Sequence, residues 1–508
     1  MKSSDAFDGL QPAGLWAHFD RITRIARPSG QEAAIRQYIE TWAGSHGFPA
    51  QRDAAGNLSV RVPPSPGAAP ASPIALQAHL DMVCVREEAS PSDPARGEIQ
   101  VVRDREWIKA EGSTLGADNG IAIAAMLHLA EAAGLRHGPM DLLFTVEEET
   151  TSSGADSLDP SLLRANILLN LDSEEEGVVV AGSAGGIWTK LRWSSPLHSV
   201  PDDWRTVEVA IAGLQGGHSG IDISKHRLNA ICGLLRILQK VAEGLPLRLG
   251  AVEGGDAFNA IPRLASAAVC YPAAEQAGFN EAISSARAEL TDEFLESEPG
   301  LSFRVTNSSA LPQVCHSLED SRRLLDMLSV LPNGVLGMDR RIPDLVETSC
   351  NLGVVAREGD HLVVQSFSRS SVTPALHAVV AAIAAAARLG GAEFSVVPPE
   401  GPCWELDPSS RALALVREAF RRLFGKEPAL QTVHAFLECS LIKKQNPELD
   451  IVSLGPEIRD AHRPGERVHI ESVGRFFRLL SEVVSDHAGE TKPVALNGNP
   501  HVGARDLH

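Results

Sequence analysis

The chain has few aromatic side chains, a deficit of basic residues and no long uninterrupted apolar run. Aromatics make up 5% of its 508 residues, so its cores must be built mainly from aliphatic side chains. Lys and Arg number 46 against 65 Asp and Glu, which gives a formal net charge of -19. This balance argues against nucleic acid and anionic membranes as partners, because both are bound through basic patches. No stretch of about 18 uncharged apolar residues occurs, so we expect no membrane-spanning helix.

Cysteines are also few, and their spacing argues against two common uses. The seven cysteines are scattered, odd in number and free of any CxxC pair. Such a pattern is typical of free thiols in a reducing cytoplasm rather than of a disulfide framework. The opening residues MKSSDAFDGLQPAG lack the apolar segment of a signal peptide. We therefore expect a cytoplasmic protein.

Apolar strand-like runs alternate with helical segments at both ends of the chain. Strands are expected in 57–62, 74–80, 140–149 and 165–177, and a helix in 117–134. This alternation predicts a doubly wound α/β domain with a largely parallel sheet. The pattern stops near residue 187 and resumes near 400, so the domain is predicted to be discontinuous, with segments 1–187 and 399–487. The last residues, 488–508, are predicted to be a flexible tail.

Residues 188–398 are predicted to form an inserted α+β lid domain with two similar halves. In the first half, TVEVAIAGLQGGHSG is a strand with a glycine-rich exit, followed by a helix over 225–244. In the second half, LVVQSFSRSS precedes a helix over 374–390. Each half thus runs strand, polar turn, helix, with His218 in the first turn and Arg369 in the second.

Several polar residues in the predicted domain of 1–187 and 399–487 can bind metals, although each has an ordinary structural explanation by itself. A histidine after a strand, such as His79, is more often structural, and ADNG at 117–120 can simply cap the following helix. The acidic runs after the strands resemble solvated strand ends, and His462 lies in a polar loop. The carboxyl ends of strands in an open α/β sheet, however, are where ligands bind, so these residues can converge.

Taken together, two histidines, two aspartates and a glutamate at the ends of apolar segments form an unusual set. Imidazole and carboxylate are suitable ligands for zinc, cobalt and manganese. Two such ions that share one carboxylate need about five protein ligands. Asp81 lies two residues beyond His79, on the same side of an extended chain. It can therefore accept the ring N–H of His79 and fix the orientation of that imidazole.

Eight segments in consistent order carry a family resemblance that spans residues 10–487. They are HLDMV, STLGADNGIAIA, EEETTSSGA, LLNLDSEEEG, GLQGGHSG, FNAIPR, LECSLIKKQNPELDIVSLGP and AHRPGERVHIESV. Together they resemble aminoacyl-histidine dipeptidases (Xaa-His dipeptidases), which belong to a wider di-zinc peptidase family that includes carboxypeptidase G and aminoacylase. Each segment is a weak signal alone, whereas eight in order are highly specific.

The resemblance implies roles for matching residues of this chain. One zinc ion would be bound by His79 and Asp172, the other by Glu149 and His462, and Asp118 would bridge them. Asp81 would orient a ligand and Glu148 would act as general base, while His218, Asn259 and Arg369 would contact the substrate from the lid. The family has two adjacent glutamates where this chain has three, so Glu147 and Glu148 are an alternative pair. The segment TTSSGA also departs from relatives, and 270–345 matches little.

The resemblance implies a cytosolic, homodimeric metallo-dipeptidase that hydrolyses Xaa-His and related dipeptides. It would use two divalent ions, zinc by preference, with cobalt or manganese as alternatives. Glu148 would accept a proton from the attacking water and pass it to the leaving amine. Arg369 would pair with the terminal carboxylate of a short peptide. Two alternatives are a di-metal amidase or deacylase that acts on N-acyl amino acids, and a non-catalytic protein of the same fold that binds metal or amino acids.

Overall fold

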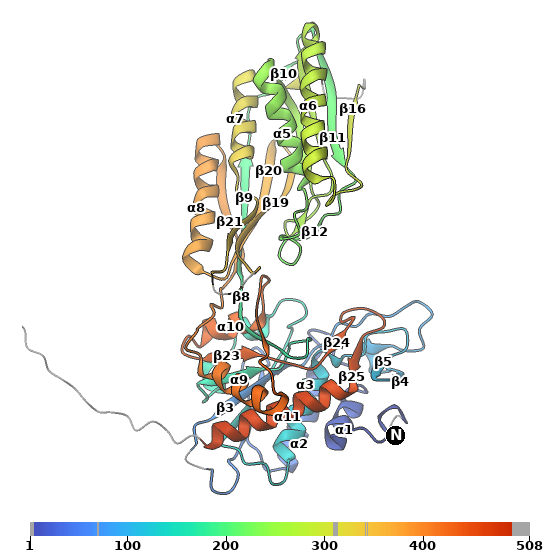
Figure 1. Ribbon diagram of the computed structural model, residues 1–508, viewed down its shortest axis with the longest axis vertical. Coiled ribbons are helices and arrows are strands. Elements are labelled where there is room, and N and C mark those ends of the chain that lie inside the picture. The colour runs from blue at the N-terminus through green and yellow to red at the C-terminus, as the bar shows by residue number, and fades with distance from the viewer. Residues whose placement is uncertain (1–4, 69–70, 308–312, 341, 343, 490–508) are drawn as a thin grey trace, which may run out of the picture. The chain divides into compact units, whose positions relative to one another are not determined.

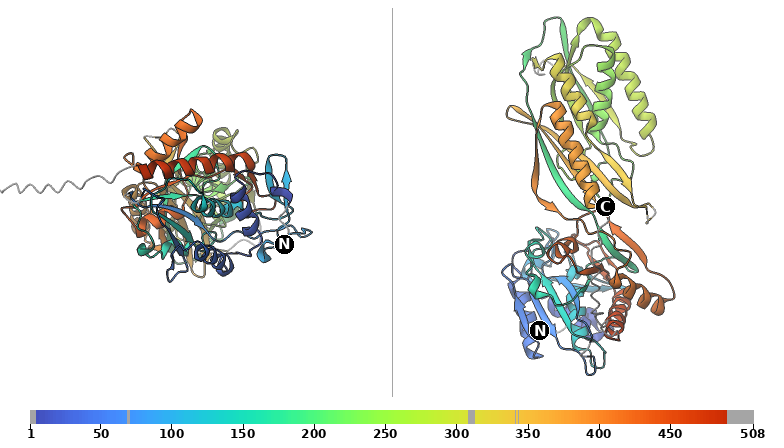
Figure 2. Two further views of the ribbon diagram at one scale, coloured as in Figure 1. Left: turned by 90° about the horizontal axis from the view of Figure 1, so that it is seen from below. Right: turned by 90° about the vertical axis from the view of Figure 1, so that its left-hand side faces the viewer.

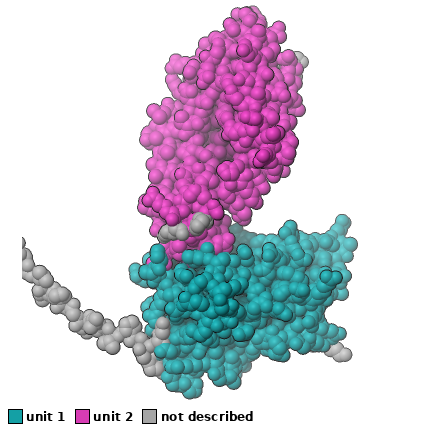
Figure 3. Space-filling model, in the orientation of Figure 1, with its two compact units in different colours: residues 1–180, 408–430, 442–508 teal, residues 181–407, 431–441 magenta. Residues whose placement is uncertain are grey.

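The chain divides into two units, and the computed structural model describes residues 5–489 except 69–70, 308–312, 341 and 343. Unit 1 comprises 1–180, 408–430 and 442–508, and unit 2 comprises 181–407 and 431–441 (Figure 3). The sequence places 181–187, 399–407 and 431–441 with the first domain instead. The structure places them in unit 2. For 185–187 and 399–401 the reason is that β9 (Gly185–Trp193) and β21 (Glu393–Gly401) pair with each other inside its sheet. The predicted tail lies outside the described residues, apart from 488–489, which end a helix.

An eight-stranded sheet lies at the centre of unit 1, in the order β1-β2-β6-β3-β7-β23-β8-β22. Its middle strands β6, β3, β7 and β23 are parallel, whereas β1, β2 and β8 pair antiparallel with their neighbours. Every residue of β3, β6 and β7 is buried, as expected for parallel strands covered on both faces. The predicted α/β class is confirmed. The strands are β1 Ala50–Arg52, β2 Leu58–Val62, β3 Ile74–His79, β6 Met140–Thr145, β7 Ile167–Asn170, β8 Val178–Ser183, β22 Ala429–Val433 and β23 Asp450–Ser453.

Helices and a small second sheet pack around these strands (Figure 1). The apolar sequence of the predicted 117–134 helix explains why α3 is buried along most of its length, between β3 and α1. The helices are α1 Ala13–Ile22, α2 Ala33–Ser45, α3 Ala117–Glu131, α4 Ser153–Asp156, α9 Arg411–Phe424, α10 Glu438–Gln445 and α11 Ile470–Gly489. The second sheet contains β4 Val101–Asp104, β5 Trp107–Ala110, β24 Ile458–Arg459 and β25 Arg467–His469.

Unit 2 is built on a nine-stranded antiparallel sheet with helices gathered on one side (Figure 2). Buried apolar residues of the sheet and of four helices form one core, which includes Cys350, Leu352 and Val364. Because side chains alternate along a strand, the neighbouring positions face the other side of the sheet. The remaining strands are β11 Trp204–Ala212, β13 Arg248–Gly254, β15 Ala265–Pro272, β16 Ser302–Thr306, β18 Gly334–Met338, β19 Val346–Glu358 and β20 His361–Ser370, and the helices are α5 Ala230–Gly244, α6 Gln276–Phe294, α7 Leu318–Val330 and α8 Thr373–Gly390.

The first helix of unit 2 begins later than its sequence suggests. A helix over 225–244 is expected, but α5 begins at Ala230. The side chain of Asn229 accepts hydrogen bonds from the backbone N–H groups of Ile231 and Cys232. Asparagine in this capping position satisfies donors that have no partner within the helix, so the helix starts there.

Among the described helices, α8 is long and apolar enough to cross a membrane by length and composition. The sequence predicts no such helix, since Arg388 interrupts its apolar run. Val379, Ile383 and Ala387 of α8 belong to the core of unit 2, where the helix packs on β9 and β20. These contacts explain the apolar composition of α8.

Candidate metal centre and substrate-contact residues

The ends of the parallel strands bring the predicted ligands together in unit 1. β3 ends at His79, and Asp172 follows the end of β7 by two residues. Glu149 lies in the turn after β6, Asp118 lies in the first turn of α3, and His462 lies between β24 and β25. These residues form two groups whose ligand atoms lie within 4.8 Å of one another, namely His79, Asp118 and Asp172, and Asp118, Glu149 and His462.

Asp118 belongs to both groups because its two carboxylate oxygens face different partners. Its Oδ1 lies 3.0 Å from Nε2 of His79, which is 3.2 Å from Oδ1 of Asp172. Its Oδ2 lies 2.9 Å from Nε2 of His462, which is also 2.9 Å from Oε2 of Glu149. One carboxylate thus stands between two sets of imidazole and carboxylate ligands, which is the arrangement that two cations with a shared ligand require.

The electrostatics of this cluster favour a cation. Hydrogen bonds to Asp118 and Glu149 raise the pKa of His462 to about 11. Burial, reinforced by Asp118 and Glu148, raises the pKa of Asp172 to about 8. Burial also opposes the ionisation of Asp118, yet the two histidines hold its pKa well below its usual range. Carboxylates outnumber imidazoles here, so positive charge is needed to balance them.

The buried atoms of Glu149 test whether the residues present fit a metal. Its side chain is 4% exposed, and its Oε1 has no hydrogen-bond partner among the described residues. A buried carboxylate oxygen without a partner is costly unless it meets a donor or a cation. Together with the mixed imidazole and carboxylate donors, this oxygen fits a divalent transition metal.

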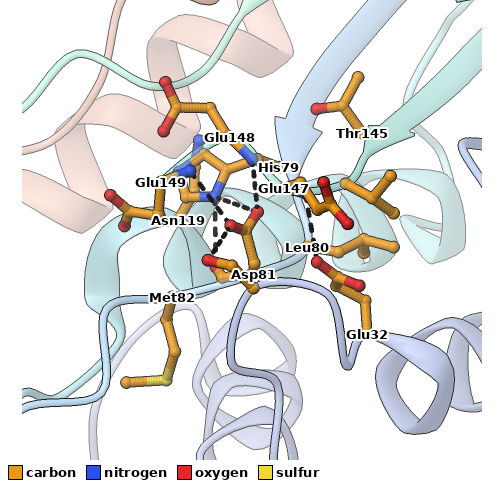
Figure 4. A network of polar contacts seen from close by, with 12 residues as sticks. Glu32, His79, Leu80, Asp81, Met82, Asn119, Thr145, Glu147, Glu148 and Glu149 are labelled. Carbon is orange, nitrogen blue, oxygen red and sulfur yellow. Dashed lines mark hydrogen bonds and ion pairs between the residues drawn. The ribbon is translucent and has the colours of Figure 1, made fainter. Parts of the chain in front are cut away.

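The three consecutive glutamates separate into two environments. Oε2 of Glu147 accepts hydrogen bonds from the hydroxyls of Ser153 at 2.6 Å and Thr151 at 3.1 Å. Glu148 and Glu149 instead offer carboxylate oxygens within 4.8 Å of a ligand atom of His79. The carboxylates of Glu147 and Glu148 diverge in Figure 4. The geometry therefore favours Glu148 and Glu149 as the pair that faces the metal centre.

Asp81 contacts more of the centre than the ring of His79 that the sequence prediction gives it. Nδ1 of His79 lies 3.2 Å from the backbone carbonyl of Asp81 and 3.5 Å from its carboxylate. The carboxylate accepts hydrogen bonds from the backbone N–H groups of Glu148 and Glu149, each at 3.1 Å (Figure 4). It also accepts one from the hydroxyl of Ser29. Asp81 thus holds the turn that carries both glutamates in addition to facing His79.

Two further side chains at this centre have no signal of their own in the sequence. Nδ2 of Asn119 donates to Oδ1 of Asp172 at 2.5 Å, and its position directly after Asp118 is the one clue to it. Burial and the charges of Asp118 and Asp172 raise the pKa of the Glu174 carboxyl to about 8. Glu174 stands within an ordinary acidic run, DSEEEG, where sequence alone cannot separate it from its neighbours.

The three predicted substrate-contact residues lie in unit 2, where His218 lies on a short strand and Asn259 lies in the turn before the strand that pairs with it. β12 (Gly217–His218) pairs with β14 (Ala260–Ile261), and the backbone N–H of Ser219 donates to the carbonyl of Asn259. A side chain at Gly220 would place its Cβ 2.4 Å from the carbonyl of His434, so glycine is required there. The same Cβ would lie 3.1 Å from His218 and 3.2 Å from Arg369, so these two side chains flank Gly220.

The ring of His218 is fixed by its own loop. Its Nδ1 accepts hydrogen bonds from the backbone N–H groups of Gly220 and Ile221. The carboxylate of Asp222 accepts a hydrogen bond from the backbone N–H of His218. Burial and the charge of Arg369 lower the pKa of this imidazole. The neutral ring therefore carries its proton on Nε2, which can donate to a ligand.

Arg369 lies on the side of the sheet opposite the helices, because side chains alternate along β20 and the preceding residue, Ser368, pairs across the sheet with the core residue Cys350. Its guanidinium stacks 4.5 Å from the ring centroid of Phe367, and its Nε has no partner among the described residues. Burial lowers its pKa to about 10, so it remains a cation at pH 7. A buried cation with an unused donor suits an anionic ligand.

Comparison with known proteins decides the family. The model of peptidase family M20/M25/M40 matches residues 75–486. The chain belongs to this family. The sequence resemblance is thus confirmed. A cytosol non-specific dipeptidase of Escherichia coli (strain K12) is similar to this M20/M25/M40 member, with 38% identity over 481 residues that cover 94% of this chain and 98% of that protein.

Solved structures of similar proteins agree with the fold of this M20/M25/M40 member. The aminoacylhistidine dipeptidase from Vibrio alginolyticus superposes with a TM-score of 0.90 at 35% identity, over 94% of this chain and 98% of that one. Aminopeptidase PepT from Bacillus cereus has a TM-score of 0.54 at 15% identity, over 95% of this chain and 100% of that one. The second likeness shows a shared fold alone.

Proposed function

We propose that this M20/M25/M40 peptidase is a cytoplasmic, metal-dependent dipeptidase that hydrolyses Xaa-His and related dipeptides. The observation that carries the proposal is Asp118, whose two oxygens face two separate sets of imidazole and carboxylate ligands. The names of the Escherichia coli and Vibrio alginolyticus relatives support the dipeptide substrate. Zinc is the preferred metal, with cobalt or manganese as alternatives, and the homodimer stays a prediction.

The proposed chemistry assigns a task to each group. When bound by the five ligands, a pair of divalent cations supplies Lewis acidity toward water and the peptide carbonyl. Glu148 takes a proton from the attacking water and delivers it to the leaving amine. Nε2–H of His218 donates to the oxygen that gains negative charge, and Arg369 binds the terminal carboxylate. Asn259, whose backbone is tied to the His218 loop, is the third substrate contact.

Removal of the metal tests this proposal directly. We expect the purified protein to bind two equivalents of Zn²⁺, to lose dipeptide hydrolysis after dialysis against a chelator, and to regain it when Zn²⁺, Co²⁺ or Mn²⁺ is added back. Elemental analysis and a panel of β-Ala-His, Gly-Gly and N-acetyl amino acids provide the measurements. Faster turnover of N-acetyl amino acids would identify an amidase or deacylase. Two bound metals without turnover of any substrate would identify a binding protein.

The fixed ring of His218 gives a second prediction. Glutamine can place an amide N–H near the position of Nε2, whereas asparagine places it near Nδ1. We expect His218→Asn to lower kcat about 10²- to 10³-fold, as for loss of an oxyanion donor, and His218→Gln to retain more activity. Because the pKa of His218 is lowered, its neutral form persists below pH 6.5, and no acid limb from this group should appear above that pH.

The measurement for His218 is kcat against pH for both variants and the wild type on one dipeptide. His226→Gln is the control, since His226 is an exposed histidine in the same loop region. Equal activity of the two His218 variants, or a more active His218→Asn, would contradict the assigned tautomer.

A further inference from the structure

Two buried side chains of opposite charge, Arg27 and Glu466, lie beside the candidate metal centre without belonging to either ligand group. Arg27 is 1% exposed and Glu466 is 2% exposed. Their charges attract each other, yet within the described part of the chain their side chains form hydrogen bonds with backbone groups. The segments that they bind are those that carry the metal ligands.

Glu466 joins the segment of His462 to the segment of Asp118. Its two carboxylate oxygens accept four consecutive backbone N–H groups, those of Leu115 at 2.7 Å, Gly116 at 2.9 Å, Ala117 at 2.7 Å and Asp118 at 3.2 Å. The residue before α3 is Gly116, which has no side chain to cap the helix, so Glu466 supplies the acceptors from a distant part of the chain. Since Glu466 follows His462 by four residues, these four hydrogen bonds restrain the position of His462 relative to Asp118.

Arg27 joins the segment of His79 and Asp81 to the segment of Asp118. Its Nη1 donates to the carbonyls of Leu80 and Asp81, and its Nη2 donates to the carbonyl of Gly116. A Cβ at Gly116 would lie 2.5 Å from Nη2, and one at Gly120 would lie 2.8 Å from it. Both positions therefore have to be glycine for the guanidinium to fit.

The loop that carries His462 needs such support. His462 has a backbone φ of 63° and Asp460 has one of 58°, in the left-handed region that costs energy for residues other than glycine. The side chain of His462 is 52% exposed, so little packing holds it in place. The hydrogen bonds of Glu466, four residues along the chain, therefore help to restrain the position of this ligand.

We propose that Arg27 and Glu466 are positioning residues that hold the three ligand-bearing segments 79–81, 115–118 and 462–466 at the separation that two cations require. The inference rests on the proposed metal site of the dipeptidase. Residues outside the ligand shell that orient ligands typically change metal affinity or activity about 10- to 100-fold when they are replaced. We expect losses of that size.

The experiment uses the full chain with the substitutions Glu466→Gln and Arg27→Lys, which keep side-chain size or charge. Asp141→Asn is the matched control, because Asp141 is also buried and accepts a backbone N–H and a guanidinium, from Arg164, near the opposite end of β6. For each protein, Zn²⁺ affinity is measured by competition with a chromophoric chelator. Circular dichroism reports folding, and kcat and KM are measured on a dipeptide at saturating Zn²⁺.

We expect Glu466→Gln and Arg27→Lys to bind Zn²⁺ about 10- to 100-fold more weakly and to lower kcat more than KM, while Asp141→Asn binds Zn²⁺ as the wild type does. Zn²⁺ affinity and kcat equal to those of Asp141→Asn would overturn the inference. Failure of both variants to fold, with a folded Asp141→Asn, would also overturn it, since the pair would then serve general stability. A wild-type protein that binds fewer than two Zn²⁺ would instead refute the proposed function.

Discussion

Replacing Glu148 with glutamine should lower kcat for dipeptide hydrolysis about 10²- to 10⁴-fold, the range that general acid–base catalysis contributes. Glutamine keeps the size of the side chain but cannot accept a proton from water. The turn that carries residue 148 is held by the backbone N–H groups that donate to Asp81, and the substitution leaves these in place. KM should change little, because the proposed substrate contacts lie in unit 2.

The neighbouring glutamate is a control that the chain itself offers. Glu147→Gln changes the same functional group one residue away. The carboxylate of Glu147 accepts hydrogen bonds from the hydroxyls of Ser153 and Thr151. We expect this variant to keep nearly full activity. A large loss from Glu147→Gln, with an active Glu148→Gln, would show that the catalytic pair is Glu147 and Glu148.

The metal content of Glu148→Gln separates a base from a ligand. Glu148 also lies in a group with His79 and Glu149 whose ligand atoms are within 4.8 Å of one another. If Glu148 is the base, the variant should still hold two equivalents of metal by elemental analysis. Loss of one equivalent would make Glu148 a ligand and leave the role of base unassigned.

Replacing Arg369 with methionine should lower kcat/KM for dipeptides roughly 30- to 5,000-fold. The range corresponds to about 2–5 kcal/mol for removing one partner of a buried, hydrogen-bonded charge pair. Methionine resembles arginine in its unbranched apolar stem but carries no charge, so the terminal carboxylate of the substrate would lose its partner. Arg369→Lys should recover only part of the loss, because an ammonium cannot form two parallel hydrogen bonds to a carboxylate.

A change in the substrate makes the test of Arg369 specific. The wild type should prefer a dipeptide over its C-terminal amide by a large factor, and Arg369→Met should lose most of that preference. Arg304→Met is the control, since Arg304 lies on β16 of the same sheet with its side chain 70% exposed. An unchanged preference for the free carboxylate in Arg369→Met would contradict the assigned contact.

The sequence was sufficient for the fold class and the family. Buried strands such as 74–79 appear as short apolar runs, and the alternation with helices predicts a parallel sheet, because both signals depend on local hydrophobic patterning. The eight motifs are equally local. The antiparallel edges of the sheet and the membership of 431–441 in unit 2 are not local, since they depend on which strands pair.

The sequence also nominated His79, Asp118, Glu149, Asp172 and His462 as ligands, and the structure brings them into two groups that share Asp118. Their roles as ligands stay predictions until metal is measured. The sequence could not decide among the three glutamates, because a shift of one residue in a turn leaves no pattern. The structure separates them through the hydrogen bonds of Glu147 to Ser153 and Thr151.

What the sequence determined by itself is the chemistry available to this protein: the residue types, their order and the strands that they follow. Tertiary structure alone decided which backbone groups hold those residues. Glu466 follows His462 without any motif for its role, yet its carboxylate binds four N–H groups near residue 118. The physical reason is that the hydrogen-bond partners of a buried charge come from segments that are distant in the sequence. Hydrophobic periodicity and motif spacing describe each segment separately and do not show which segments will be in contact.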